Sequence, residues 1–204
     1  QTLEDSNIQS DFVRVDEDTR INVKLKSGQE TEINAPGPKV THAQFEQLLS
    51  QIRRTTNDDI VIVAGSVPNS IPSDAYAQIA QITEKTGAQL VVDAEKDLVE
   101  TVLPYRPLFI KPNKDELEVM FNTTVKSDED VIKYGKEILK KGAQSVIISL
   151  GGDGAIYVDQ HQSIKAVNPQ GHVVNTVGSG DSTVAGMVAG LSMGLNVDEA
   201  FQQA

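Results

Sequence analysis

The 204-residue sequence has no cysteine and only three histidines. Without cysteine the chain has no disulfide, no thiolate nucleophile and no cysteine-ligated zinc site, and this composition fits a reducing compartment. The histidines, His42, His161 and His172, are nowhere spaced four residues apart, as the paired ligands of a helical metal site would be. We therefore expect no thiol chemistry and no dependence of catalysis on histidine.

Basic residues are also scarce. Lys and Arg number 18 against 29 Asp and Glu, which gives a formal net charge of −11 and a pI near 4.7. Such a surface repels nucleic acids and anionic membranes, so neither is expected as a partner. No segment approaches the roughly 18 apolar residues of a membrane span, and no signal peptide opens the chain. We expect a cytoplasmic protein that binds any phosphate group at a dedicated local site.

Length and patterning indicate an α/β fold with a β appendage. Hydrophobic residues make up 39% of the chain, which suffices for a core. Residues 11–38 alternate polar and apolar side chains about a Ser27-Gly28 turn, which predicts a hairpin of antiparallel strands. Beyond it, apolar runs alternate with amphipathic stretches, which predicts a mostly parallel sheet flanked by helices. We therefore expect a β appendage within 1–38 and an α/β domain over 39–204.

The elements of the α/β domain follow from these patterns. Strands are expected over 60–65, 88–94, 108–113 and 144–152, helices over 42–52, 73–87, 114–121 and 128–142, and a final hairpin over 155–159 and 163–168. Ligands of open α/β sheets collect at the carboxyl ends of the strands. The loops that follow these strands are therefore the places to look for chemistry.

The stretch NTVGSGDSTVAGMVAG, residues 175–190, is a glycine-rich turn that leads into an apolar helix. Gly178 and Gly180 let several backbone N–H groups point at one spot, where the positive end of the helix dipole favours an anion. Asp181 in this turn is suited to accept the proton of a hydroxyl that attacks phosphorus. The structural alternative is that Asp181 only favours the helix start and the glycines only permit close packing.

Two familiar nucleotide-binding motifs are absent from the sequence. The dinucleotide fingerprint needs a third glycine where Thr183 stands, and the P-loop needs a Gly-Lys-Ser/Thr that occurs nowhere in the chain. A nicotinamide-dependent enzyme is therefore disfavoured. Any nucleotide must be bound by another device.

Two further loops carry groups suited to binding phosphate. In IKPNKDELEVMF, Lys111 and Asn113 end a strand and Glu116 lies in the first turn of a helix, so a cation, an amide and a carboxylate share one loop. Ordinary strand-end and helix-start preferences explain these residues as well. SLGGDG, residues 149–154, ends another strand with glycines whose N–H groups suit a phosphate or nucleobase, or that only form a tight hairpin.

Three more polar residues fall at predicted strands or strand ends. Arg20 in TRINVKL suits bidentate phosphate recognition, although an exposed cation on a strand is also the ordinary state of such a residue. Ser66 follows the strand of IVIVAGSVPNSIP. Asp93 ends the strand of LVVDA, where a helix cap explains it equally well.

Taken in order along nearly the whole chain, these motifs closely resemble those of the ribokinase/PfkB carbohydrate kinases. TRINVKLKSGQETEINAPGP resembles the sugar-phosphate branch of that family, which includes the 1-phosphofructokinases and tagatose-6-phosphate kinases. By this resemblance Asp181 is the catalytic base, and the N–H groups of Gly178, Ser179 and Gly180 form an anion hole. Ser179 and Asn175 depart from the family's commonest Ala and Asp.

The resemblance implies further contacts and the cofactors ATP, Mg²⁺ and K⁺. The implied residues are Lys111, Asn113, Glu116, Ser149, Gly151 and Gly154 for ATP, Glu116 for Mg²⁺ through water, Arg20 and Ser66 for the substrate, and the carbonyls of Asn175 and Val177 for K⁺. Ala64 replaces the first serine of the family's substrate loop.

The resemblance implies transfer of the γ-phosphoryl group of MgATP to a phosphorylated ketohexose, with fructose 1-phosphate to fructose 1,6-bisphosphate as the first choice. A tagatose-6-phosphate or fructose-6-phosphate kinase is the alternative within the class, and a non-catalytic sugar-phosphate or nucleotide sensor is the alternative outside it. The resemblance also implies that the strands within 1–38 are β lid strands that cover the substrate, and that the lid pairs the intact protein into a homodimer. Because Gln1 replaces an initiator Met, the family's N-terminal Gly-Gly-Lys-Gly-type segment is absent and the chain stops inside a predicted helix, we expect a longer intact protein.

Overall fold

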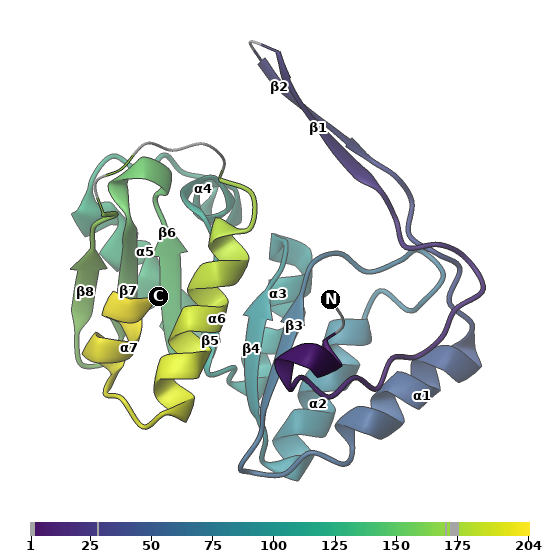
Figure 1. Cartoon of the computed structure of the whole chain (residues 1–204). Coiled ribbons are helices and arrows are strands. Elements are labelled where there is room, and N and C mark those ends of the chain that lie inside the picture. Colours follow the sequence, from purple (N-terminus) through teal and green to yellow (C-terminus); the bar gives the residue numbers. More distant parts are fainter. Residues whose placement is uncertain (1–2, 28, 170, 172–175) are drawn as a thin grey trace.

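A computed structural model describes residues 3–27, 29–169, 171 and 176–204, which form a two-stranded hairpin and a six-stranded sheet with helices on both faces (Figure 1). The strands are β1 (Asn22–Ser27), β2 (Gln29–Asn34), β3 (Ile60–Ala64), β4 (Gln89–Asp93), β5 (Phe109–Ile110), β6 (Ser145–Ser149), β7 (Ala155–Asp159) and β8 (Ser163–Ala166). The helices are α1 (His42–Ile52), α2 (Ala75–Thr86), α3 (Lys96–Val102), α4 (Lys114–Phe121), α5 (Asp128–Lys141), α6 (Ser179–Ser192) and α7 (Val197–Gln203), with short 3₁₀ turns at Glu4–Ser6, Leu103–Tyr105 and Gly151–Asp153.

The six strands lie in the order β3-β4-β5-β6-β7-β8. The first four are parallel, whereas β7 pairs antiparallel with β6 and β8 pairs antiparallel with β7. The predicted mostly parallel sheet is therefore confirmed, as is the closing hairpin across 160–162. Because the first four strands share one direction, their carboxyl ends meet at one edge of the sheet.

The central strands β4 to β7 are buried on both faces, and successive residues of each strand alternate between the faces. Val92, Val146 and Ile148 belong to the core cluster that also holds side chains from α1 to α5. Val91 and Ile147 belong to a second cluster with side chains of α6 and α7, which cover the opposite face (Figure 1). This two-sided burial is why the strands appear in the sequence as continuous apolar runs.

The hairpin of β1 and β2 is antiparallel and extends away from the larger sheet (Figure 1). Its pairing confirms the predicted hairpin, although the turn residue Gly28 lies outside the described residues. The prediction was wrong for residues 11–21, which form no strand. There the amides of Gln44 and Gln51 on α1 donate to the carbonyls of Arg14 and Asp11, at 2.9 and 2.8 Å. Alternation produces a strand only where a partner strand offers its hydrogen bonds.

The sequence patterns missed one helix and overextended two strands, of which β6 was expected over 144–152 and ends at Ser149. Helix α3 buries Val99 and Val102, but it is only seven residues long, so its periodicity is short. Strand β5 was expected over 108–113 and is only two residues long, because Pro112 brings no N–H group to a ladder. Within the described ranges, no helix combines the length and the apolar character needed to cross a bilayer.

Tyr76 on α2 fixes the loop that follows β3. Its hydroxyl donates to the carbonyl of Gly65 at 2.8 Å, and Gly65 has the left-handed φ of 86° that favours glycine. The Gly65 N–H donates in turn to the carbonyl of Asp93. Burial, with a smaller contribution from the Asp93 charge, raises the pKa of Tyr76 to about 12. The backbone that carries Ser66 is thus tied to both α2 and β4.

We expect Tyr76→Phe to lower the free energy of unfolding by about 1 kcal/mol at neutral pH, because the Gly65 carbonyl loses its donor. The pKa of Tyr76 rises from 10.0 to about 12 on folding. The stabilisation of the folded state by the protonated Tyr76 hydroxyl is therefore complete below pH 10 and is lost as the pH rises through about 12. Urea denaturation between pH 7 and pH 12 should show that the free energies of unfolding of wild type and Tyr76→Phe become equal toward pH 12. Tyr105→Phe is the control, and equal stability of wild type and Tyr76→Phe at pH 7 would contradict the expectation.

Candidate active site at the carboxyl edge of the parallel strands

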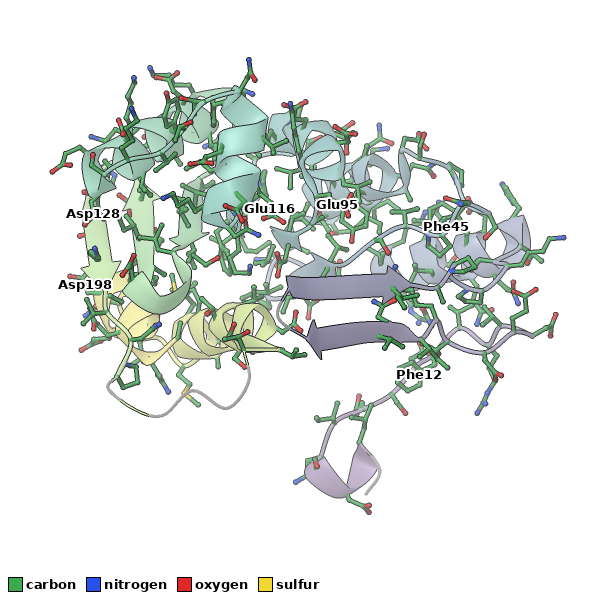
Figure 2. The ribbon with its side chains drawn as sticks, turned by 90° about the horizontal axis from the view of Figure 1, so that it is seen from above. Phe12, Phe45, Glu95, Glu116, Asp128 and Asp198 are labelled. Carbon is green, nitrogen blue, oxygen red and sulfur yellow. The ribbon has the colours of Figure 1, made fainter. Side chains whose placement is uncertain are left out.

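Polar residues gather where the four parallel strands end. Asp93 ends β4, Lys111 follows β5, Ser66 lies two residues beyond β3 and Ser149 ends β6. Figure 2 views the molecule from above, onto this edge, and labels Glu116, which lies in the first turn of α4, the helix that follows β5. The first turn of α6 lies at the same edge. Its Gly180 is so close to Lys111 that a Cβ atom added to the glycine would lie 3.1 Å from Lys111 Nζ. Strand direction thus brings together groups that are far apart in the sequence.

Buried Lys111 and half-buried Asp93 form an ion pair at the centre of this edge. Lys111 Nζ lies 3.3 Å from Asp93 Oδ1, and the lysine side chain is only 7% exposed. Burial raises the pKa of Asp93, the Lys111 ammonium opposes that shift, and the negative charge of Asp181 adds to it. The cap of α3 is Glu95, so the alternative of Asp93 as a helix cap does not hold.

The first turn of α6 carries the predicted base and anion hole. Gly178 precedes the helix with a φ of 83°, a left-handed conformation that a side chain would strain. The Ser182 N–H donates to the Gly178 carbonyl at 2.8 Å, and the Ser179 N–H donates to the Thr176 carbonyl at 3.1 Å. Asp181 is exposed in this turn. The roles of Gly178, Ser179, Gly180 and Asp181 stay predictions.

Asn113 and Glu116 cap α4. The Asn113 side-chain oxygen accepts the Glu116 N–H and the Glu116 carboxylate accepts the Asn113 N–H, both at 2.8 Å. Next to them, the Ser149 N–H donates to the Pro112 carbonyl, and Ser149 forms a parallel bridge with Asn113. Asn113 and Glu116 therefore stabilise the start of α4, as the alternative explanation by helix-start preferences expects. That role leaves the half-buried carboxylate of Glu116 beside the strand ends.

The donors at this edge suit a metal that retains its water. Among the described residues no group of three or more His, Cys, Asp or Glu side chains could hold a metal ion. Mg²⁺ is usually bound by one or two carboxylates together with water and substrate phosphates. The single carboxylate of Glu116 fits that pattern. For K⁺, Val177 is exposed before α6, and Asn175 lies outside the described residues.

The loop after β6 owes its shape to two glycines. Gly151 and Gly154 have φ angles of 60° and 91°, and a Cβ atom on Gly154 would collide with the Ala166 carbonyl oxygen. The Leu150 N–H donates to the Gly154 carbonyl at 2.8 Å. Asn168 donates its amide to the Gly151 carbonyl at 2.9 Å. The sequence patterns did not single out Asn168, because it lies after a separate strand and meets Gly151 only in the folded chain.

Arg20 and Ser66, both predicted to contact a substrate, lie together. The Arg20 guanidinium donates from Nη1 to Ser66 Oγ at 2.6 Å, which connects the chain just before β1 to the loop after β3. Both side chains are exposed. The sequence patterns did not predict the ion pair of Asp93 with Lys111. The position of Asp93 at the end of a strand was the one indication of it in the sequence.

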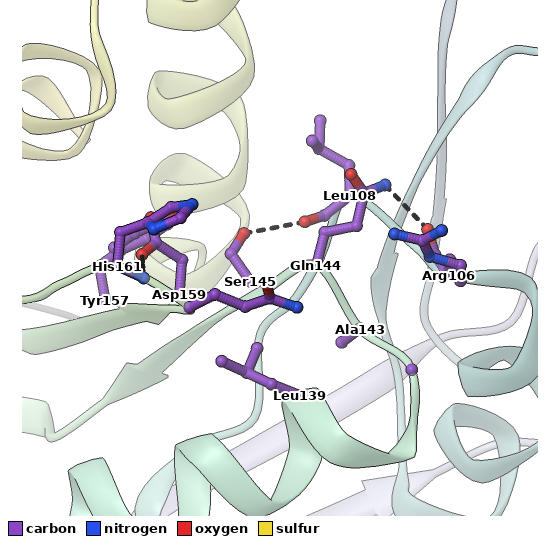
Figure 3. Close-up of a pocket in the computed structure, with 11 residues that line it drawn as sticks. Arg106, Leu108, Leu139, Ala143, Gln144, Ser145, Tyr157, Asp159 and His161 are labelled. Atoms are coloured by element: carbon purple, nitrogen blue, oxygen red, sulfur yellow. Dashed lines mark hydrogen bonds between the residues drawn. The ribbon is translucent and has the colours of Figure 1, made fainter.

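A cavity of about 500 Å³ lies at the opposite ends of β5 and β6 (Figure 3). Three of its polar side chains already donate hydrogen bonds within the protein: Ser145 to the Leu108 carbonyl, Gln144 to the Arg106 carbonyl, and the Tyr157 hydroxyl to Asp159. Its volume falls within the range of small-molecule binding sites. The carboxyl edge is the stronger candidate, because it combines a buried cation, a helix N-terminus and exposed carboxylates.

Comparison with known proteins gives matches over almost the whole chain. Residues 1–204 match the family described as pfkB family carbohydrate kinase. The chain is 42% identical over 200 residues to a Bacillus subtilis 1-phosphofructokinase, covering 98% of this chain and 66% of the relative.

Two solved structures share the fold. The first is a Staphylococcus aureus protein provisionally assigned as a phosphofructokinase, with 78% identity, a TM-score of 0.87, and coverage of 98% of this chain and 65% of that one. The second is phosphofructokinase-2 from Escherichia coli in complex with potassium, with 29% identity, a TM-score of 0.86, and coverage of 98% and 66%. The chain thus spans about two thirds of the length of the proteins it matches, and the expected fold is confirmed.

Replacing Glu116 by alanine is expected to lower the free energy of unfolding by about 1 kcal/mol, because the Asn113 N–H loses its acceptor at the start of α4. Glu116→Gln keeps an oxygen acceptor at the same place and should stay within about 0.5 kcal/mol of wild type. Urea denaturation of the three proteins measures both effects. Equal losses from alanine and glutamine would show that charge, and not the capping hydrogen bond, stabilises the helix.

Proposed function

This chain belongs to the pfkB family of carbohydrate kinases, and on that premise we propose that the whole protein transfers the γ-phosphoryl group of ATP to a hydroxyl of a phosphorylated ketohexose. We favour fructose 1-phosphate as the substrate and fructose 1,6-bisphosphate as the product, because the Bacillus subtilis relative is a 1-phosphofructokinase. The observation that carries the proposal is the first turn of α6, which places Asp181 at a strand edge that holds a buried ammonium group.

In the proposed reaction, Asp181 accepts the proton of the attacking sugar hydroxyl. A bond forms between that oxygen and the γ-phosphorus, and the bond from the γ-phosphorus to the bridging oxygen breaks, so ADP leaves with the electron pair. The charge on the transferring group is stabilised by the first-turn N–H groups of α6, by the helix dipole and by the nearby Lys111 ammonium. Little more than positioning and charge stabilisation is required of the protein.

We propose that the nucleotide binds along the loops that follow β5 and β6. The residues assigned to it are Lys111, Asn113, Glu116, Ser149, Gly151 and Gly154. Glu116 would hold Mg²⁺ through water, and the bound metal would supply neutralising charge to the phosphates. The Escherichia coli neighbour contains potassium, and we extend a K⁺ site to the carbonyls before α6, at Asn175 and Val177.

Arg20 and Ser66 are proposed to bind the sugar phosphate. Their hydrogen bond holds the guanidinium over the loop after β3, where a planar fork of donors suits a phosphate group. Residues 1–38 would then form a lid over a kinase domain of residues 39–204. A cytoplasmic location is proposed as well, since the absence of cysteine fits a reducing compartment.

Asp181→Asn is expected to lower kcat by roughly 10³-fold or more while the affinity for MgATP stays within about threefold, because only proton transfer is removed. ADP release is measured with fructose 1-phosphate, fructose 6-phosphate and tagatose 6-phosphate, and MgATP binding is measured by calorimetry. Asp198→Asn, in the first turn of α7, is the matched control.

Near-normal turnover of Asp181→Asn would remove Asp181 from the role of base. A preference for either 6-phosphate would replace the favoured substrate by the alternative within the class. Binding of sugar phosphate or nucleotide by the wild-type protein without ADP release would support a sensor in place of a kinase.

We also propose that the β1–β2 hairpin joins two copies of the protein. Val23 and Ile33 are paired across the hairpin, yet they are 42% and 55% exposed, and Ile21 next to them is 71% exposed. An isolated two-stranded hairpin is marginal in water, and apolar side chains exposed along it favour a partner surface. A second hairpin of the same sequence offers a matching surface.

Ile33→Asp is therefore expected to convert a dimer into a monomer, because a carboxylate would be buried between the two hairpins. Light scattering after size-exclusion chromatography gives the mass of each species. Val119→Asp, at an exposed apolar position on α4, is the control and should leave the mass unchanged. A wild-type monomer at micromolar concentration, or a dimer that survives Ile33→Asp, would refute the interface.

A further inference from the structure

Lys111 lies in a buried position that is energetically unfavourable for a cation. Of the side chains that the structure describes, it is the one charged group in the buried set, which otherwise contains the polar residues Thr83 and Ser145. Removing an ammonium group from water is costly unless a partner and further dipoles replace the water. Because a lysine occupies this buried position, the surrounding structure must provide a partner charge and dipoles in place of water.

Asp93 supplies the compensating charge from the neighbouring strand. Its Oδ1 lies 3.3 Å from Lys111 Nζ, and the parallel pairing of β4 with β5 fixes the two backbones, since the Lys111 N–H donates to the Val92 carbonyl at 3.1 Å. The Asp93 carbonyl is held as well, by the N–H of Gly65. The carboxylate therefore has little freedom, and it restricts the ammonium group to one place.

The pair forms the floor beneath the first turn of α6. A Cβ atom on Gly180 would lie 3.1 Å from Lys111 Nζ, 3.3 Å from Lys111 Cε and 4.0 Å from Asp93 Oδ2. Gly180 has an ordinary helical φ, so close contact with the pair explains the glycine better than backbone strain does. The helix N-terminus, which favours anions, thus rests directly on the positive charge that would face the same anion.

We propose that Asp93 is a positioning residue: it holds the Lys111 ammonium group against the first turn of α6, so that the turn and the lysine together bind the transferring phosphoryl group. The inference rests on the proposed kinase function. In this proposal Asp93 contacts no substrate, nucleotide or metal. Asp93 affects turnover only through the position of Lys111. Without Asp93 the lysine side chain would leave the floor of the site for solvent.

The position of Lys111 can be tested without any enzyme activity. Brief acetylation with acetic anhydride, followed by mass spectrometry of the Lys111 peptide, is applied to wild type and to Asp93→Asn. We expect the rate at Lys111 to rise about tenfold or more in the variant, because the side chain gains exposure once its partner is lost. The Lys165–Asp128 pair, which is exposed, is the control: Asp128→Asn should leave the Lys111 rate unchanged. An unchanged Lys111 rate in Asp93→Asn would overturn the proposal.

A double-mutant cycle tests whether Asp93 acts only through Lys111. Lys111→Met and Asp93→Asn are each expected to lower kcat, by roughly 10²-fold and 10-fold, while the KM for the sugar phosphate changes less than about threefold. The double variant should match Lys111→Met within about twofold. Losses that multiply would overturn the proposal, because Asp93 would then act on a metal or substrate itself.

Gly180→Ala is the second variant, in case Asp93→Asn does not fold. It keeps every charge but places a methyl group against the pair, so faster acetylation of Lys111 is expected together with a lower kcat. A normal acetylation rate with normal kcat would overturn the proposal. Absence of turnover in the wild type would refute the proposed function alone, since acetylation still reports whether Asp93 holds Lys111.

Discussion

The parallel pairing of β3 through β6 is the constraint on which the candidate site depends. It gives four strands one direction, so the groups that follow them meet at one edge although long segments of chain separate them. Burial of the central strands on both faces supports this edge, because Val91 and Val92 are fully enclosed by different core clusters. Precise placement of charged side chains needs that rigid support.

The electrostatics of the site are local and run against those of the whole chain. A net charge of −11 repels phosphorylated ligands at long range, and screening by salt limits that repulsion to about 10 Å. Within the site, the Lys111 ammonium group is buried beside its Asp93 partner, where charges interact more strongly than in water, and the N-terminus of α6 lies against it at the surface. These local groups are the ones that we propose attract a phosphate group in spite of the acidic surface.

Several residues serve the fold and the proposed chemistry together. Asn113 and Glu116 close the capping box of α4, and the same two residues are assigned to the nucleotide and its metal. Local sequence patterns predicted α1 and α4 at their observed bounds, because capping and periodicity act within a few residues. They failed for residues 11–21, where side chains of α1 compete for the backbone, and for the short α3.

The sequence by itself determined the α/β class, the hairpin, and the loops that carry Asp181, Asn113 and the glycines at 151 and 154, since these depend on local spacing and backbone freedom. Only the tertiary structure decided which of those groups meet. The Lys111–Asp93 pair, the contact of Gly180 with that pair, and the bond from Arg20 to Ser66 join different strands and loops. Such contacts are set by strand order and packing, which no short stretch of sequence contains.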